Sequence, residues 1–152
     1  MNKENKFKLK RAVNFLKDLH FKTENIMVTG SVALDLQGLL PKDRNIHDVD
    51  LIIRMDEQTW RCLKLLEEIY ADEDKLTKHL LQDYPMSRKD TVFFDVDGLI
   101  LNIWKADDEW SDLKESETGI YIATAEHIFK AKKGYARPKD YEDINAIIKN
   151  IL

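Results

Sequence analysis

The sequence predicts a mixed α/β (α+β) fold, in which a small mixed β-sheet is flanked by helices. Apolar residues recur at helical spacing near the N-terminus, and short apolar runs typical of strands follow. Asp97-Gly98 joins two such runs as a two-residue hairpin turn. The chain has 152 residues, of which 43% are hydrophobic and 34% are charged, as is ordinary for one globular domain. We therefore expect residues 1–152 to form a single domain.

The first half of the chain alternates helices and strands. A helix is expected over residues 6–19, because its apolar residues share one face and its lysines share the other. A short buried strand over residues 25–29 follows. Gly30-Ser31 then turns the chain into a helix over residues 32–39, and a polar connection runs over residues 41–47.

The middle of the chain contains the second strand, over residues 49–54, which is apolar on both faces and therefore expected at the centre of the sheet. A helix over residues 56–70 begins with acidic residues, where the helix dipole favours them. Cys62 is interpreted as a core residue of that helix. Residues 72–89 are polar and give no clear pattern.

The second half begins with the predicted hairpin, whose strands are expected over residues 91–96 and 99–104. One more short strand is expected over residues 120–123. A C-terminal helical segment, about residues 125–152, should consist of two helices separated by a break at Gly134, the second of them opened by Pro138.

Composition excludes several classes of function. The formal net charge of −4 makes a long nucleic acid an unlikely partner, and the single cysteine excludes an internal disulfide framework. No apolar run approaches the ~18 residues that a membrane-spanning helix needs. The lysine-rich N-terminus lacks the apolar centre of a signal peptide. We therefore expect a cytoplasmic protein without a membrane anchor.

The most informative feature is a glycine corner followed by an acidic pair. Gly30-Ser31 opens a helix, and the backbone N–H groups of such a corner can bind a phosphate. Asp48 and Asp50 lie two residues apart on a strand, so both side chains emerge on the same face. Two carboxylates beside a phosphate seat would hold Mg²⁺ with a nucleotide. The alternatives are a hydrated strand end, or two carboxylates that repel each other beside a salt bridge. Two carboxylates on one face cost free energy unless a cation or hydrogen-bond donors compensate.

This pattern resembles the nucleotidyltransferase superfamily, whose fold is that of DNA polymerase β-like enzymes. The family pattern is a strand, Gly-Gly or Gly-Ser, a helix, Asp-hydrophobic-Asp on the next strand, and a third carboxylate on a later strand. The run Gly-Ser-Val-Ala-Leu-Asp-Leu, with Arg44 ahead of the acidic pair, is closest to the branch of aminoglycoside- and lincosamide-modifying nucleotidyltransferases and AbiEii-type toxins. The segment 132–143, Lys-Lys-Gly-Tyr-Ala-Arg-Pro-Lys-Asp-Tyr-Glu-Asp, is also similar to that branch. The resemblance covers most of the chain.

The resemblance implies a metal-dependent transfer of a nucleoside monophosphate from a nucleoside triphosphate to a hydroxyl of a small molecule or a protein. Asp48 and Asp50 would hold Mg²⁺ or Mn²⁺, and Gly30 and Ser31 would contact a phosphate. Arg44 and Lys132 would pair with the departing pyrophosphate. Arg44 alternatively lies solvated in its loop, and Lys132 alternatively pairs with an acid of the last helix. Because the chain is short, a homodimer or a partner subunit is expected to complete the acceptor pocket.

One position departs from the family pattern. Asn102 stands where the third carboxylate is expected, and an amide cannot act as a general base. With Asp97-Gly98 as a two-residue turn, Asp95 pairs opposite Ile100 and shares a face with Asn102, so Asp95 is a candidate for the third catalytic carboxylate; a solvent-facing residue near the hairpin tip is the alternative.

Two further expectations follow from this departure. Asn102 itself is assigned to the nucleotide-binding residues, and Trp104, on the same face, is a candidate to line a nucleobase pocket. The alternative to an enzyme is a catalytically degenerate member of the family. Such a protein would bind a nucleotide or a metal and act as a regulator or partner subunit, as in a toxin–antitoxin pair.

Overall fold

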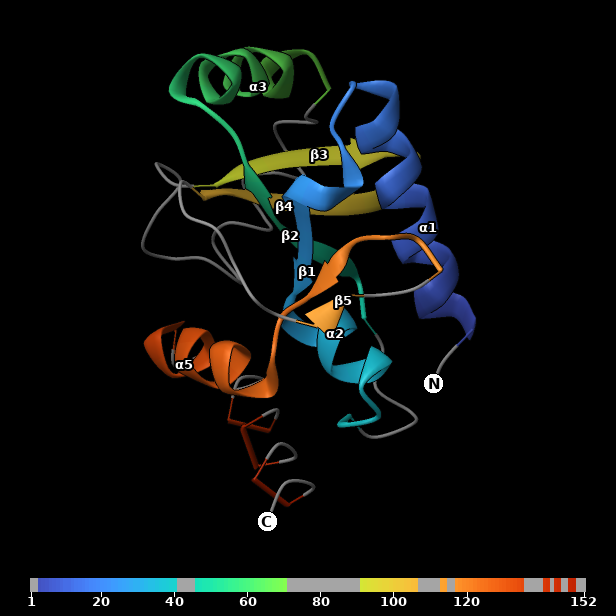
Figure 1. Ribbon diagram of the computed structural model, residues 1–152, viewed down its shortest axis with the longest axis vertical. Helices are drawn as coiled ribbons and strands as arrows, with labels where there is room; N and C mark the ends of the chain where they lie inside the picture. Colours follow the sequence, from blue (N-terminus) through green and yellow to red (C-terminus); the bar gives the residue numbers. More distant parts are fainter. Residues whose placement is uncertain are drawn as a thin grey trace.

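The protein forms a six-stranded mixed sheet with helices packed around it (Figure 1), so the predicted fold class is confirmed. The strand order is β3-β4-β2-β1-β6-β5. The computed structural model describes residues 3–40, 46–70, 91–106, 113–114, 117–135, 141–142, 144–145 and 148–149.

The elements follow in an order close to the predicted one. They are α1 (Lys3–Asp18), a 3₁₀ turn (Thr23–Asn25), β1 (Ile26–Thr29), α2 (Gly30–Leu36), β2 (Asp48–Arg54), α3 (Glu57–Tyr70), β3 (Val92–Val96), β4 (Leu99–Ala106), β5 (Leu113–Lys114), β6 (Tyr121–Ile122) and α5 (Ala125–Tyr135).

The strand β2 lies at the centre of the sheet, as its apolar sequence predicts. It pairs antiparallel with β1 and parallel with β4. The hairpin of β3 and β4 is also confirmed, and its turn residues Asp97 and Gly98 have φ angles of 51° and 88°. Two consecutive positive φ angles are typical of the type I′ turn, which matches the twist of the two strands.

One face of the sheet is sealed by α1, and the other carries the polar residues of β2. The Phe15 ring of α1 lies 5.5 Å from the Phe94 ring of β3, which places α1 on the face that Phe94 shares with Leu101. On β2, buried and half-buried residues alternate along the strand. The half-buried positions include Asp48 and Asp50, so the acidic pair lies on the face opposite α1.

The helix α3 lies beside β3, the edge strand of the sheet (Figure 1). Its buried residues are Trp60, Leu63 and Glu67, one helical face of α3. The Glu67 Oε2 atom accepts a hydrogen bond of 2.7 Å from the Phe93 backbone N–H. A helix side chain thus satisfies a donor of the edge strand.

Two predictions about helices are wrong. Cys62 is exposed, because the face of α3 that packs on the core contains Trp60 and Leu63 instead. Gly134 does not end the preceding helix, since α5 continues to Tyr135. A glycine inside a helix costs only about 1 kcal/mol relative to alanine, which neighbouring residues can compensate.

Some predictions fall outside the described ranges. These are most of the connection over residues 41–47, the segment 72–89 and the helix start at Pro138. The described residues between 141 and 149 are helical, in agreement with the C-terminal helical segment. None of the helices in the described part of the chain is long and apolar enough to cross a bilayer.

Candidate functional site

The acidic pair lies at the start of the central strand. Asp48 and Asp50 are both half-buried on β2, and Val49 between them is fully buried on the other face. The alternation of a strand therefore places both carboxylates on one face, as the spacing predicts. Half-burial leaves each side chain partly open to solvent.

Asn102 of β4 bridges the two carboxylates. In the parallel pairing of β2 with β4, Asn102 is the direct neighbour of Asp50. Its Nδ2 atom donates to Asp48 Oδ2 at 2.6 Å and to Asp50 Oδ1 at 2.7 Å. The side chain is fully buried. A primary amide carries two N–H hydrogens, so one is available to each carboxylate.

These two bonds change the electrostatic balance of the pair. Two carboxylates on one face cost free energy unless a cation or hydrogen-bond donors compensate. A hydrogen bond to a charged group contributes about 1.5–3 kcal/mol. The Asn102 amide therefore offsets part of the cost of placing two carboxylates on one face.

The same three side chains fit a divalent cation. Mg²⁺ prefers hard oxygen ligands and is commonly held by one or two carboxylates together with water and substrate phosphates. Asn102 Oδ1 is a buried oxygen with no hydrogen-bond donor among the residues that the structure describes. Two carboxylates and an amide oxygen would supply ligands of the right chemistry.

Gly30 brings the start of α2 against the acidic pair. Its φ is 66°, in the left-handed region that favours glycine. A Cβ at this position would collide with Asp50 Oδ2 and would lie 3.1 Å from Asp50 Cγ. The neighbouring pair Thr29 and Asp50 are cross-strand partners in β1 and β2, which fixes this approach. The structure thus places the glycine corner and the acidic pair together.

Ser31 lies in the first turn of α2 and is half-buried. The Thr29 side chain makes no capping hydrogen bond to the start of this helix. Further along α2, the buried Asp35 accepts a hydrogen bond of 2.9 Å from Asn5 Nδ2 of α1. This contact between two buried polar side chains ties α2 to α1 and so supports the position of the corner.

Asp95 is not brought to the acidic pair. Its predicted pairing opposite Ile100 is confirmed, but Ile100 is in turn the neighbour of Asp48. Asp95 therefore lies two strands from Asp48, which corresponds to about 10 Å. Its Oδ1 atom accepts a hydrogen bond of 2.8 Å from the Gly98 N–H and so closes the hairpin turn. Within the described ranges, no three His, Cys, Asp or Glu side chains form a group that could hold a metal.

The remaining predicted site residues are placed only in part. Arg44 lies outside the described residues, and for Lys132 the structure describes the backbone of α5 alone. Trp104 is half-buried and is the direct neighbour of Ile52 on the face that carries Asn102 and Asp50. Across the sheet the same row continues through Met27 to Tyr121. This apolar row lies on the same face of the sheet as Asp50 and Asn102, two residues further along each strand.

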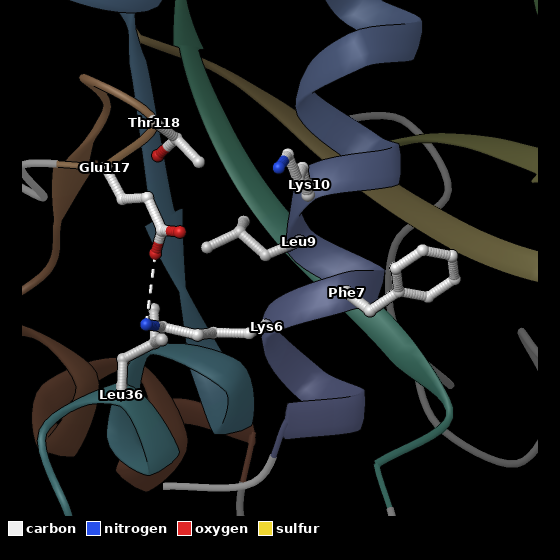
Figure 2. Close-up of a pocket in the computed structure, with 7 residues that line it drawn as sticks. All are labelled: Lys6, Phe7, Leu9, Lys10, Leu36, Glu117 and Thr118. Carbon is white, nitrogen blue, oxygen red and sulfur yellow. Dashed lines mark ion pairs between the residues drawn. The ribbon is translucent and has the colours of Figure 1, made fainter.

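A small cavity lies elsewhere on the molecule (Figure 2). Its volume is about 90 Å³, and it lies between α1, the end of α2 and the chain before β6. Lys6 Nζ and Glu117 Oε2 form an ion pair of 3.0 Å across it. None of the predicted site residues lines this cavity, so it is separate from the acidic site.

The sequence does not predict the bridging role of Asn102. The parallel pairing that places it between the two carboxylates joins strands far apart in the chain, and no local pattern encodes that register. The available signal was the amide itself, an uncharged donor at the position where the family pattern has an acid. From the sequence, Asn102 is an amide where the resembled pattern has a carboxylate; in the structure, that amide donates a hydrogen bond to both acids.

Comparison with protein-family models gives no match, and comparison with curated proteins gives none either.

Proposed function

We propose that this protein is a nucleotidyltransferase-like domain that binds a nucleoside triphosphate with Mg²⁺ or Mn²⁺ and transfers the nucleoside monophosphate to a hydroxyl of a small molecule or a protein. The observation that supports the proposal best is the juxtaposition of Asp48, Asp50 and Gly30. Two carboxylates share the half-buried face of the central strand. One of them, Asp50, lies directly against Gly30, which has a positive φ and opens a helix.

Each residue has a role in this proposal. Asp48 and Asp50 hold the cation, which supplies charge neutralisation on the phosphates when bound. Gly30 allows a phosphate to approach the backbone, and Ser31 offers an N–H and a hydroxyl to a phosphate oxygen. The half-buried Trp104 offers an aromatic face to the base, one step along the strands from the acidic pair.

The transfer step itself needs positioning rather than covalent help from the protein. The acceptor oxygen attacks the α-phosphorus, and a new P–O bond forms. The bond from that phosphorus to the oxygen bridging the α- and β-phosphates breaks, and pyrophosphate leaves with the electron pair. The hydroxyl proton passes to solvent, because Asp95 lies away from the pair and closes the hairpin turn instead.

Asn102 favours a second candidate function. An amide at the position of the third carboxylate cannot accept the acceptor's proton. A degenerate family member would keep the nucleotide and metal seat without performing transfer, and it would act as a regulator or as a partner subunit of a toxin–antitoxin type. The two candidates share the binding site and differ in whether pyrophosphate is released.

Thermal-shift measurements test both candidates. The four nucleoside triphosphates are added with Mg²⁺ or Mn²⁺ to the wild-type protein and to an Asp48→Asn/Asp50→Asn double variant. A ligand at a hundredfold excess over its dissociation constant stabilises by about 2.7 kcal/mol, a rise in Tm of roughly 5–10 °C at this size. The rise should need metal and should be lost in the double variant.

The outcomes separate the candidates. A metal-dependent shift with release of labelled pyrophosphate on addition of an acceptor supports the enzyme. A shift without any release supports the binding protein. No shift with any nucleotide contradicts both. The expected second subunit is tested by light scattering on the active sample, and a monodisperse active monomer would contradict it.

A further inference from the structure

We infer that the Asn102 amide and a divalent cation are alternative partners of the two carboxylates of Asp48 and Asp50. The amide nitrogen takes the position between them when no cation is bound. The inference rests on the proposed function only in assigning Asp48 and Asp50 to a divalent cation. It concerns how that site is occupied when no metal is present, and what a cation must displace in order to bind.

The Asn102 amide nitrogen lies between one oxygen of each carboxylate. Nδ2 of Asn102 lies 2.6 Å from Asp48 Oδ2 and 2.7 Å from Asp50 Oδ1. A Mg²⁺ ion binds oxygen at about 2.0–2.1 Å and cannot tolerate the positively polarised N–H group at the same place. A cation that contacts both oxygens must therefore displace the amide nitrogen.

The amide can change partners without a change in the backbone. Rotation by about half a turn about the Cβ–Cγ bond exchanges Nδ2 with Oδ1, and this torsion is soft and nearly two-fold in asparagine. Oδ1 would then face the cation as a ligand. Asn102 is fully buried and is held between Phe93 on one side and Asp50 on the other. Close packing therefore favours two discrete orientations over a continuous range.

Two properties follow from this exchange. Because the amide donates a hydrogen bond to each carboxylate, the wild-type fold should persist in EDTA. The affinity for a free cation is lowered, because binding must break two hydrogen bonds to charged groups. Asn102 is thus a positioning residue that sets how readily the site takes up metal.

The decisive experiment measures Mn²⁺ binding without nucleotide, by the electron paramagnetic resonance signal of free Mn²⁺. Asn102→Asp should bind Mn²⁺ at least about tenfold more tightly than the wild type, because a carboxylate replaces the competing donor. In EDTA the same variant should melt about 5 °C or more below the wild type, since three carboxylates meet without a donor. Saturating Mn²⁺ should restore its Tm.

A matched control uses a second contact between an asparagine and an aspartate, in which both side chains are buried. Asn5 Nδ2 donates to Asp35 Oδ2 at 2.9 Å, and Asn5 is also buried. Asn5→Asp should lower the metal-free Tm as well, because it also removes a donor from a buried carboxylate. It should not produce the tight Mn²⁺ binding or the recovery of Tm with Mn²⁺. The control separates loss of a structural contact from a change at the cation site.

Three results would overturn the inference. In the first, Asn102→Asp binds Mn²⁺ no more tightly than the wild type. In the second, it is as stable as the wild type in EDTA. The third needs no substitution: the Asn102 side-chain NH₂ protons of the metal-free wild type, observed by NMR, exchange with solvent as fast as those of exposed amides.

The nucleotide experiment can fail separately. Tight Mn²⁺ binding by Asn102→Asp, in a protein whose wild type binds no nucleoside triphosphate, would support the inference and contradict the proposed function.

Discussion

The two faces of β2, formed by alternate residues of one seven-residue strand, serve opposite purposes. On the α1 face, Val49, Leu51 and Ile53 are fully buried in the core. On the other face, Asp48, Asp50 and the residues that follow at every second position are half-buried. The strand's alternation separates core from site within one element. Substitutions on the first face should therefore act on folding, and substitutions on the second on binding.

The largest effect is expected on the core face. Leu51→Ala should lower the free energy of unfolding by about 2–5 kcal/mol, because a fully buried leucine leaves a cavity in a packed core. Urea denaturation measures the loss. The neighbouring Ile52→Ala, on the half-buried face, is the matched control and should cost clearly less. An equal decrease in the free energy of unfolding for both variants would contradict the assignment of the core to one face of β2.

The second effect concerns the corner that meets the site face. Gly30→Ala should cost about 2 kcal/mol or more, because it combines positive φ with a collision against Asp50. It should also abolish the metal-dependent thermal shift. Gly38→Ala is the control, since Gly38 has φ of 71° and open space around its Cβ position. If the two variants lose equal stability, the collision with Asp50 is not significant.

A third, smaller effect tests the apolar row beside the acidic pair. Trp104→Ala should weaken nucleoside triphosphate binding by about tenfold, since stacking of a base on an aromatic side chain is worth about 1–3 kcal/mol. Trp104→Phe should retain most of the affinity, because an aromatic face remains. Isothermal titration calorimetry measures both. Unchanged affinity in the alanine variant would remove Trp104 from the binding surface.

The smallest effect lies away from both faces, at the start of α3. Asp56 Oδ1 accepts a 2.8 Å hydrogen bond from the Thr59 N–H, and this bond holds the pKa of Asp56 below its ordinary value. A lowered pKa in the folded state stabilises above the unfolded pKa of about 3.9, and the contribution is lost as pH falls through the folded pKa. Asp56→Ala should therefore give a small Tm decrease at pH 7 that shrinks below about pH 4. A Tm difference independent of pH would contradict this assignment.

Residues close together in the sequence predict the elements whose contacts are also close in sequence, such as the β3–β4 hairpin. The Asp97-Gly98 turn defines the hairpin and its register, so the pairing of Asp95 with Ile100 is predictable from a few residues. Which face of α3 packs on the core cannot be predicted in this way. Apolar residues such as Leu65 and Ile69 also lie on its exposed face. Periodicity alone does not decide which face packs on the core, so the sequence places Cys62 in the core although it is exposed.

In the candidate site, too, local sequence predicts only the part that depends on neighbouring residues. The spacing of Asp48 and Asp50 predicts that they share a face, and the glycine corner is placed beside them as expected. The partner of the two carboxylates depends on the parallel pairing of β2 with β4, which only the assembled sheet determines. Asn102 could therefore be identified as unusual from the sequence, whereas its contacts could not.

The carboxylate of Glu67 has a consequence for assembly. An edge strand with free N–H groups is a template on which a strand of another chain can extend the sheet. At β3 the N–H of Phe93 is already bonded to Glu67. An incoming strand would have to expel a buried, charged side chain before it could pair at this position. The contact of Glu67 with β3 therefore disfavours the addition of a strand at this position of the edge.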